Sequence, residues 1–163
     1  MPYSEPLVPR ALGERVRPEP PRRGEPGGEP CGSCGGATTS ALWQDDLWTL
    51  HAPVSGSLPG AVWVASREHF DSFADMPANC AADFGRMAGR VERAILSLGD
   101  VARVHLYRWG DGGAHFHVWF IPRPLGMLEA RGMYLPIWED VLPNVSDAEL
   151  AAVASKVAAS MAS

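Results

Sequence analysis

The stretch HFHVWFIPRP, at residues 115–124, constrains the fold more than any other part of the chain. Successive side chains of a β-strand point to opposite faces of a sheet, so alternate residues share a face. One alternate set is apolar and would enter a core: Phe116, Val118 and Phe120. The other set would line the opposite face: His115, His117 and Trp119. The pattern predicts a strand that buries one face and presents two imidazoles and an indole on the other.

Short apolar runs predict strands over four ranges: 46–51, 61–66, 101–109 and 114–121. The first two strands are close enough in sequence to pair as a hairpin, and so are the last two. Both pairs are therefore expected to be antiparallel. The sequence GDGG at 110–113 is expected to form the turn between the last two strands.

Apolar residues at helical spacing predict a long helix between the second and third strands: Phe84, Met87, Val91, Ile95 and Leu98. Pro77 fits its first turn, and Gly99 fits its C-terminal stop. Ser146 to Glu149 has the pattern of a capping box, which predicts a last helix. Together these elements predict an α+β fold, a small antiparallel sheet with helices packed on one face.

Residues 1–30 differ in composition from the rest of the chain. They are rich in Pro, Arg, Glu and Gly and contain few apolar residues, so they cannot bury enough surface to offset the entropy cost of ordering. We therefore expect a flexible arm over 1–30 and one folded domain over 31–163.

The overall composition argues against several classes of function. A net charge of −5 is not that of a general nucleic-acid binder, which would carry a basic surface. No apolar stretch approaches the length of a membrane span, and no secretory signal is visible. With three cysteines and no export signal, a cytoplasmic protein without disulfides is expected.

Two of the cysteines, Cys31 and Cys34, form a Cys-Gly-Ser-Cys pair, a spacing that indicates a metal knuckle or a redox dithiol. A redox pair usually precedes a helix, and no helical pattern follows Cys34, so zinc is the favoured interpretation. His51 and His105 are both candidates for the remaining ligands. Cys80 precedes the apolar face of the long helix and is expected to be a core or boundary residue.

The histidine-bearing strand resembles the signature of the histidine triad (HIT) superfamily, in which three histidines alternate with apolar residues. The following Pro122–Arg123 pair has the spacing found in many family members. His115 then matches the first histidine and His117 the second, while Trp119 stands in the place of the third. The resemblance runs from about residue 31 to residue 123 and implies a HIT-like domain.

The galactose-1-phosphate uridylyltransferase branch of the superfamily also departs from histidine at the third position, and it keeps a zinc site. Its ligands are a Cys-x-x-Cys pair, a histidine before the main helix and the first histidine of the triad. The resemblance implies that the matching residues here bind a structural zinc ion: Cys31, Cys34, His69 and His115. They would tie an N-terminal zinc knuckle to the sheet.

The resemblance also implies that His117 is catalytic. In the family, the second histidine attacks the α-phosphorus of a nucleotide and forms a covalent nucleotidyl-imidazole, which water or another phosphate resolves. Neutral imidazole is a competent nucleophile near pH 7, provided that a partner such as a backbone carbonyl holds its other N–H. For an isolated histidine, a hydrogen-bonded position on a polar sheet face would be the simpler interpretation.

Trp119 alters this chemistry, because an indole N–H can hold a phosphate oxygen but cannot exchange a proton. Three outcomes stay open: a leaving group that needs no acid, an acid supplied from elsewhere, or nucleotide binding without chemistry. A fourth is that Trp119 is simply a large apolar residue filling the sheet.

The turn before the triad offers backbone groups to a phosphate. The N–H groups of Gly112 and Gly113 could cradle an anion, and a plain hairpin turn explains the same residues equally well. Asp111 would repel a phosphate unless it points away. Arg123 could reach a phosphate or be a solvated surface residue.

The sequence therefore predicts a zinc-containing HIT-like protein that binds a nucleoside mono- or polyphosphate or a nucleotide conjugate. It would act as a nucleotidyl hydrolase or nucleotidyltransferase through an adduct on His117. A non-catalytic nucleotide-binding module with a structural zinc is the alternative. A hydrolase in which zinc activates water is disfavoured, because four protein ligands leave no open position. The resemblance also suggests a homodimer.

Overall fold

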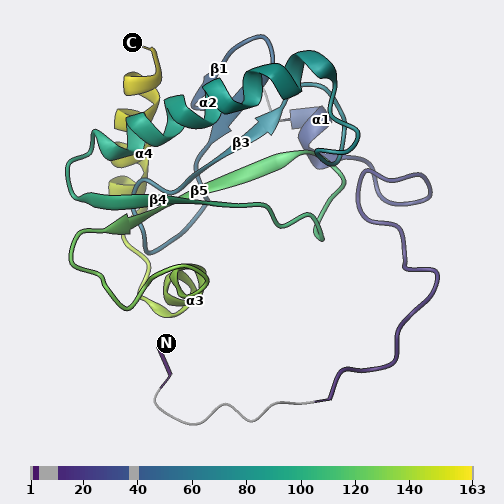
Figure 1. Cartoon of the computed structure of the whole chain (residues 1–163), viewed down its shortest axis with the longest axis horizontal. Helices are drawn as coiled ribbons and strands as arrows, with labels where there is room; N and C mark the ends of the chain where they lie inside the picture. The colour runs from purple at the N-terminus through teal and green to yellow at the C-terminus, as the bar shows by residue number, and fades with distance from the viewer. Residues whose placement is uncertain (1, 4–10, 37–40, 163) are drawn as a thin grey trace.

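The computed structural model describes residues 2–3, 11–36 and 41–162. Five strands form one sheet in the order β1-β2-β3-β5-β4, and every neighbouring pair is antiparallel (Figure 1). The strands are β1 (Trp43–Gln44), β2 (Trp48–His51), β3 (Val62–Ser66), β4 (Val101–Tyr107) and β5 (His117–Pro124). The helices are α1 (Gly32–Gly36), α2 (Ala78–Leu96), α3 (Tyr134–Val141) and α4 (Asp147–Ala162).

The predicted assignment of alternate β5 side chains to the core face of the sheet is confirmed. Phe116 and Phe120 are fully buried and Val118 is 3% exposed, because all three enter the main hydrophobic core. The strand lies between β3 and β4, with Val118 opposite Val64 and Phe120 opposite Val62. His117 and Trp119 therefore point to the other face of the sheet.

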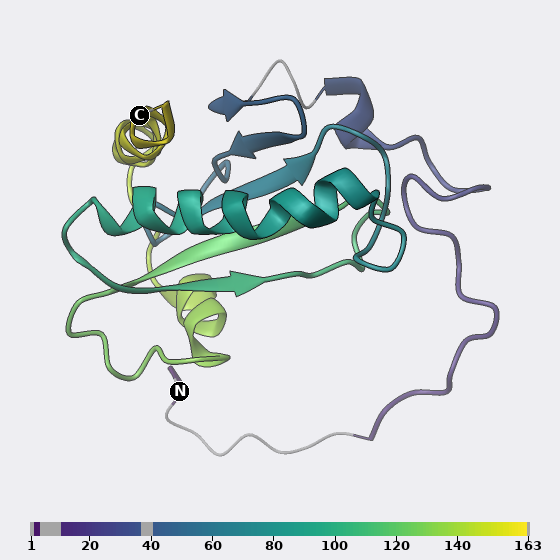
Figure 2. The ribbon, with the colours of Figure 1, turned by 45° about the horizontal axis from the view of Figure 1, so that its top comes forward.

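Helix α2 covers the core face of the sheet, and α4 packs against α2 (Figure 2). Met87, Val91 and Ile95 on its predicted apolar face have no exposed surface. Pro77 is the residue that caps its N-terminus, and Gly99 has a φ of 93°, a left-handed conformation that glycine adopts without a steric cost.

A third helix, α3, lies on the opposite face of the sheet from α2 (Figures 1 and 2). Leu135 from α3 is buried in a second, smaller cluster with Leu58, Ile121 and Ala130. The sequence pattern predicted no element here, because α3 has only eight residues and contains a proline. The helix is held by this tertiary packing, and it forms one wall of the site described below.

The connection between β4 and β5 is longer than the predicted GDGG turn. The chain leaves β4 at Tyr107 and rejoins the sheet only at His117. Residues in between pair with other segments: the Ala114 N–H donates to the Arg23 carbonyl at 2.7 Å, and the Phe116 N–H donates to the Phe70 carbonyl at 2.7 Å. These contacts draw the chain away from the edge of β4.

The segment before Cys31 is exposed in its first part and contacts the domain in its second part. Residues 11–21 are exposed, whereas Arg22 forms an ion pair with Asp71 at 2.5 Å.

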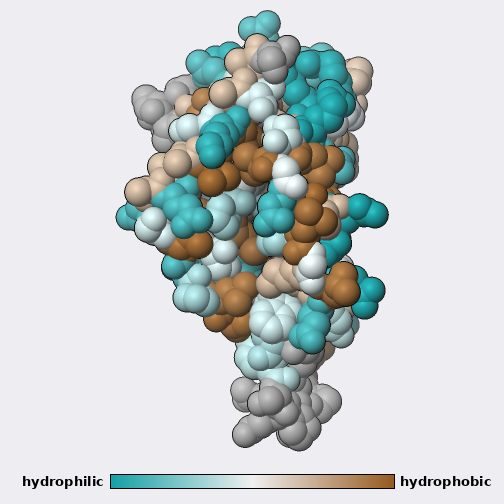
Figure 3. Space-filling model, turned by 90° about the vertical axis from the view of Figure 1, so that its left-hand side faces the viewer, coloured by the Kyte–Doolittle hydropathy of each residue, from teal (hydrophilic) through white to brown (hydrophobic). Residues whose placement is uncertain are grey.

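At the end of the molecule where the α2–β4 and β5–α3 connections lie, hydrophobic and hydrophilic residues are interspersed over the surface (Figure 3). None of the described helices combines the length and apolar character needed to cross a membrane.

Candidate functional site

Four side chains from three distant segments meet beside the start of β5. They are Cys31, just before α1, Cys34 within α1, His69 in the connection from β3 to α2, and His115. Each offers one ligand atom, and these atoms all lie within 4.8 Å of one another. The four residues grouped by resemblance in the sequence thus form one cluster that could hold a metal ion.

The spacing of the cluster fits a tetrahedral ion. Cys34 Sγ lies 3.2 Å from His69 Nδ1 and 3.5 Å from His115 Nδ1, and Cys31 Sγ lies 3.4 Å from His115 Nδ1. Bonds of about 2.3 Å to sulfur and about 2.0–2.1 Å to nitrogen place the two atoms about 3.6 Å apart around tetrahedral zinc. Little movement would bring the ligands to such an ion.

His115 is oriented for this role by β3. Its Nε2 lies 2.8 Å from the backbone carbonyl of Ser66, so that Nε2–H donates there and Nδ1 turns its lone pair toward the two sulfurs. Burial lowers the pKa of His115 and favours the neutral, ligating form. Burial and the adjacent Cys31 thiol raise the pKa of Cys34 to about 11, and a bound dication would reverse this preference for the thiol.

The other candidate ligands lie elsewhere. His51 Nε2 is 2.9 Å from Thr49 Oγ1, and its ring stacks on Trp63 at 4.1 Å. His105 stacks on Tyr107, and its buried Nε2 has no hydrogen-bond partner among the described residues. The sequence showed no helical pattern after Cys34, whereas in the structure Cys34 lies within α1, a single helical turn.

His117 is held in one orientation by its own strand. Its Nδ1 lies 2.8 Å from the backbone carbonyl of His115, two residues earlier. A carbonyl only accepts, so Nδ1 carries the proton and Nε2 of the neutral ring keeps a free lone pair. This is the arrangement that a nucleophilic imidazole requires.

Three clefts run along the sheet face that carries His117. One, of about 330 Å³, is lined by Arg23, Ser33, Gly112, Gly113, His117 and neighbouring residues. The next, of about 610 Å³, shares Ser33 and His117 with it and extends to Trp63 and Trp119. The third, of about 380 Å³, continues from Trp119 toward α3. Neighbouring clefts share lining residues, and His117 lines the first two; we refer to the three clefts together as the groove.

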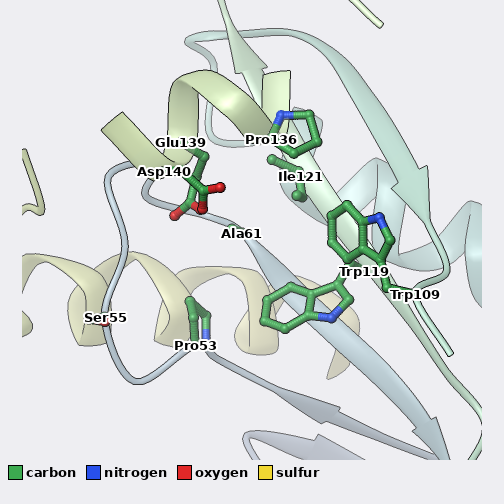
Figure 4. Close-up of a pocket in the computed structure, with 9 residues that line it drawn as sticks. All are labelled: Pro53, Ser55, Ala61, Trp109, Trp119, Ile121, Pro136, Glu139 and Asp140. Atoms are coloured by element: carbon green, nitrogen blue, oxygen red, sulfur yellow. The ribbon is translucent and has the colours of Figure 1, made fainter. Parts of the chain in front are cut away.

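The third cleft has aromatic and acidic walls. Trp109 and Trp119 line one side, and the carboxylates of Glu139 and Asp140 from α3 line another (Figure 4). Pro53 from the β2–β3 connection also contributes to the lining. Trp119 is partly buried against the smaller apolar cluster, and it also forms part of the wall of two clefts.

The glycines before the triad line the same cleft as His117. Arg123 does not reach the groove, because it is only 9% exposed and its guanidinium donates to the Met127 carbonyl at 3.2 Å, beyond the end of the triad. Arg123 is therefore neither a phosphate contact in the groove nor a solvated surface residue, and both interpretations are wrong.

Two tryptophans of the groove were not predicted. Trp63 on β3 lies directly opposite Trp119, with 6.2 Å between ring centroids, and its ring makes a T-shaped contact with His117 at 6.2 Å between centroids. Alternation within AVWVAS could have shown this, because Trp63 faces away from Val62 and Val64. Trp109 follows β4 and stacks on Tyr107 at 5.0 Å, a placement that depends on the long connection.

Solved structures of histidine triad proteins share this architecture. A hypothetical histidine triad nucleotide-binding protein from Sulfolobus tokodaii is 15% identical, with a TM-score of 0.61 over 81% of this chain and 92% of that one. A Zn-bound histidine triad family protein from Mycobacterium smegmatis is 18% identical, with a TM-score of 0.57 over 79% and 91%. A histidine triad protein from Bradyrhizobium japonicum is 17% identical, with a TM-score of 0.62 over 77% and 93%.

At the level of sequence, neither a family model nor a curated protein matches the chain. The likeness is therefore one of three-dimensional structure, and it extends over most of each compared chain. The chain has the α+β fold of the histidine triad proteins.

Proposed function

We propose that this protein binds a nucleoside phosphate or nucleotide conjugate in the groove and that His117 forms a transient nucleotidyl adduct. The observation that carries the proposal is the hydrogen bond from His117 Nδ1 to the His115 carbonyl, which leaves Nε2 with a lone pair beside the groove. The histidine triad fold and the nucleotide-binding description of a structural neighbour support it.

The proposed reaction has two steps. Nε2 of His117 attacks the α-phosphorus, a nitrogen–phosphorus bond forms, and the bond to the leaving group breaks with its electron pair. Water or a second phosphate then attacks the same phosphorus and releases the imidazole. The proton stays on Nδ1 and remains hydrogen-bonded to the carbonyl of His115, whose dipole stabilises the positive charge that the ring carries in the adduct.

We propose zinc as the ion of the Cys31, Cys34, His69 and His115 cluster, on the basis of its two sulfur and two nitrogen ligands. Zinc would act there as a structural crosslink, since these four ligands complete a tetrahedron and leave no position for water. The ligand set and the change at Trp119 also support a relationship with the galactose-1-phosphate uridylyltransferase branch. We also propose that the protein is cytoplasmic and forms a homodimer.

Mass spectrometry tests the adduct. The wild-type protein is incubated with the four common nucleoside di- and triphosphates and with nucleoside phosphoramidates, beside His117→Ala and His105→Gln. His105 is the matched control, a histidine of the same sheet that lies outside the groove. We expect a nucleotidyl mass increase or product with the wild type and His105→Gln and none with His117→Ala. Absence of adduct and product from the wild type on every substrate would contradict the catalytic proposal.

A second candidate function is nucleotide binding without chemistry, and Trp119 favours it. An indole at the third position can hold an oxygen but cannot deliver a proton to a leaving group. Calorimetry distinguishes the two, because a binding module would retain tight nucleotide binding while releasing no product.

A further inference from the structure

The segment from Arg22 to Cys31 crosses the β4–β5 connection and is fixed to it at both ends. Arg22 pairs with Asp71 at 2.5 Å and donates to the Gly110 carbonyl. The Arg23 carbonyl accepts from the Ala114 N–H at 2.7 Å, next to a bridge between Arg23 and Gly113. At the other end, Cys31 belongs to the Cys/His cluster. We refer to residues 22–31 as the strap.

Arg22 and Arg23 have different surroundings, because successive side chains of an extended segment point to opposite sides. Arg22 is neutralised by Glu25 and Asp71. Arg23 lines the cleft that contains His117, and no carboxylate of the described residues forms an ion pair with it. Its guanidinium lies beside α1, since a Cβ atom placed on Gly32 would be 3.5 Å from Arg23 Nη1.

The other groups around this cleft offer little positive charge to a phosphate. Gly112 and Gly113 have no side chain, and Trp119 is a neutral donor further along the groove. Ser33, next in sequence to Gly32, lines both clefts that His117 lines and carries a hydroxyl. A guanidinium and a hydroxyl are the groups that hold phosphate oxygens in proteins.

We infer that Arg23 of the strap and Ser33 of α1 supply the phosphate-binding side chains of this site, with Arg23 as the cation and Ser33 as a second donor. The inference rests on the proposed function and adds the residues that recognise the phosphate. It also fixes the direction of the ligand. Glu139 and Asp140 lie at the far end of the groove and repel a phosphate, so the phosphate lies toward Arg23 and the organic part toward Trp119.

The test compares phosphorylated and unphosphorylated ligands. Calorimetry measures the affinities of the four ribonucleoside 5′-monophosphates and their nucleosides for the wild type, Arg23→Ala, Arg23→Lys and Ser33→Ala. Arg23→Ala should weaken monophosphate binding about tenfold to a hundredfold, which is the contribution of a charge-assisted hydrogen bond, and leave nucleoside binding unchanged. Arg23→Lys should recover part of the loss, because the charge stays and the two-pronged geometry is lost. Ser33→Ala should show a smaller loss with the same selectivity.

Arg15→Ala is the matched control, since Arg15 lies among the exposed residues 11–21. Equal monophosphate affinity of the wild type and Arg23→Ala would overturn the inference and leave the proposed function standing. Equal losses for monophosphates and nucleosides would also overturn it, because they would indicate a structural role. A wild-type protein that binds no nucleotide would instead overturn the proposed function, and this inference with it.

Discussion

At the scale of single residues, the tautomer of His117 and the identity of residue 119 determine what the groove can do. The His115 carbonyl keeps the proton of His117 on Nδ1, so backbone geometry alone leaves Nε2 of the proposed nucleophile with a free lone pair. Trp119 lines the wall of two clefts, where its apolar surface can contact the organic part of a ligand. Strand β5 thus carries both the proposed nucleophile and an apolar surface, whereas Trp119 offers no acid for a leaving group.

Replacing this indole with imidazole tests the consequence. We predict that Trp119→His raises turnover of substrates with a poor leaving group by about 10²-fold, the usual contribution of a positioned general acid. Substrates with a good leaving group, such as nitrophenyl esters of nucleotides, should show no comparable gain. Steady-state kinetics on matched substrate pairs, with Trp119→Phe as a control that removes the N–H, provides the measurement. An equal change on both substrates would contradict the explanation.

At the scale of elements, α2 is joined to the sheet by a polar contact as well as by its apolar face. Trp48 of β2 is fully buried, and its indole N–H donates to Asp83 Oδ2 on α2 at 2.9 Å. Arg86 forms an ion pair with the same carboxylate at 2.6 Å. The hydrogen bond from Arg86 is the main reason that the pKa of Asp83 is lowered, and the Trp48 N–H contributes.

This contact predicts a dependence of stability on pH. Because the pKa of Asp83 is lower in the folded chain than in the unfolded chain, its contribution is present above about pH 4 and is lost as the pH falls through the folded value. Asp83→Asn keeps an acceptor for Trp48 and removes the charge, so the free energy of unfolding at pH 7 should fall by about 1 kcal/mol or less. The loss should shrink as the pH falls through the lowered pKa of Asp83 in the folded chain.

Urea unfolding between pH 2.5 and pH 7 measures this effect. Glu92→Gln is the control, a carboxylate on the same helix for which no ion pair is found among the described residues. A stability difference between Asp83→Asn and the wild type that is the same at every pH would show that the charge is not responsible.

At the scale of the whole molecule, the Cys/His cluster joins segments that are distant in sequence. It contains residues from the strap and α1, from the β3–α2 connection, and from the start of β5. The same strap carries Arg23 and Arg22, so the cluster and the ion pair with Asp71 together hold the end of the groove where we propose that the phosphate binds. Binding a metal should therefore stabilise the fold and one wall of the groove at once.

Removal of the metal tests this coupling. We predict that Cys31→Ser or a strong chelator removes about one equivalent of zinc and lowers the melting temperature by about 5 °C or more. Trypsin should then cleave after Arg22 and Arg23, which are fixed by the strap contacts when the metal is bound. Metal analysis, calorimetry and limited proteolysis measure the three effects, with Cys80→Ala as a control because Cys80 lies outside the cluster. Unchanged zinc content in Cys31→Ser would contradict the assignment.

Elements whose pattern is local could be predicted from the sequence. Alternation defined the core face of β5, helical spacing defined the buried stripe of α2, and Ser146 Oγ accepts the Glu149 N–H at the start of α4, as the capping box predicted. The resemblance at the triad also grouped the four Cys/His residues that lie together in the structure. Their roles as ligands, and that of His117 as nucleophile, stay predictions.

Much of the wall of the groove depends on contacts between distant segments, which the sequence patterns did not predict. Arg23 comes from a segment whose composition predicted a flexible arm, and α3 is held by a small apolar cluster on the second face of the sheet. Trp109 reaches the groove because the β4–β5 connection is drawn out by Arg23 and Phe70. Each placement depends on contacts between residues far apart in the chain, and the periodicity of a single segment carries no information about such contacts.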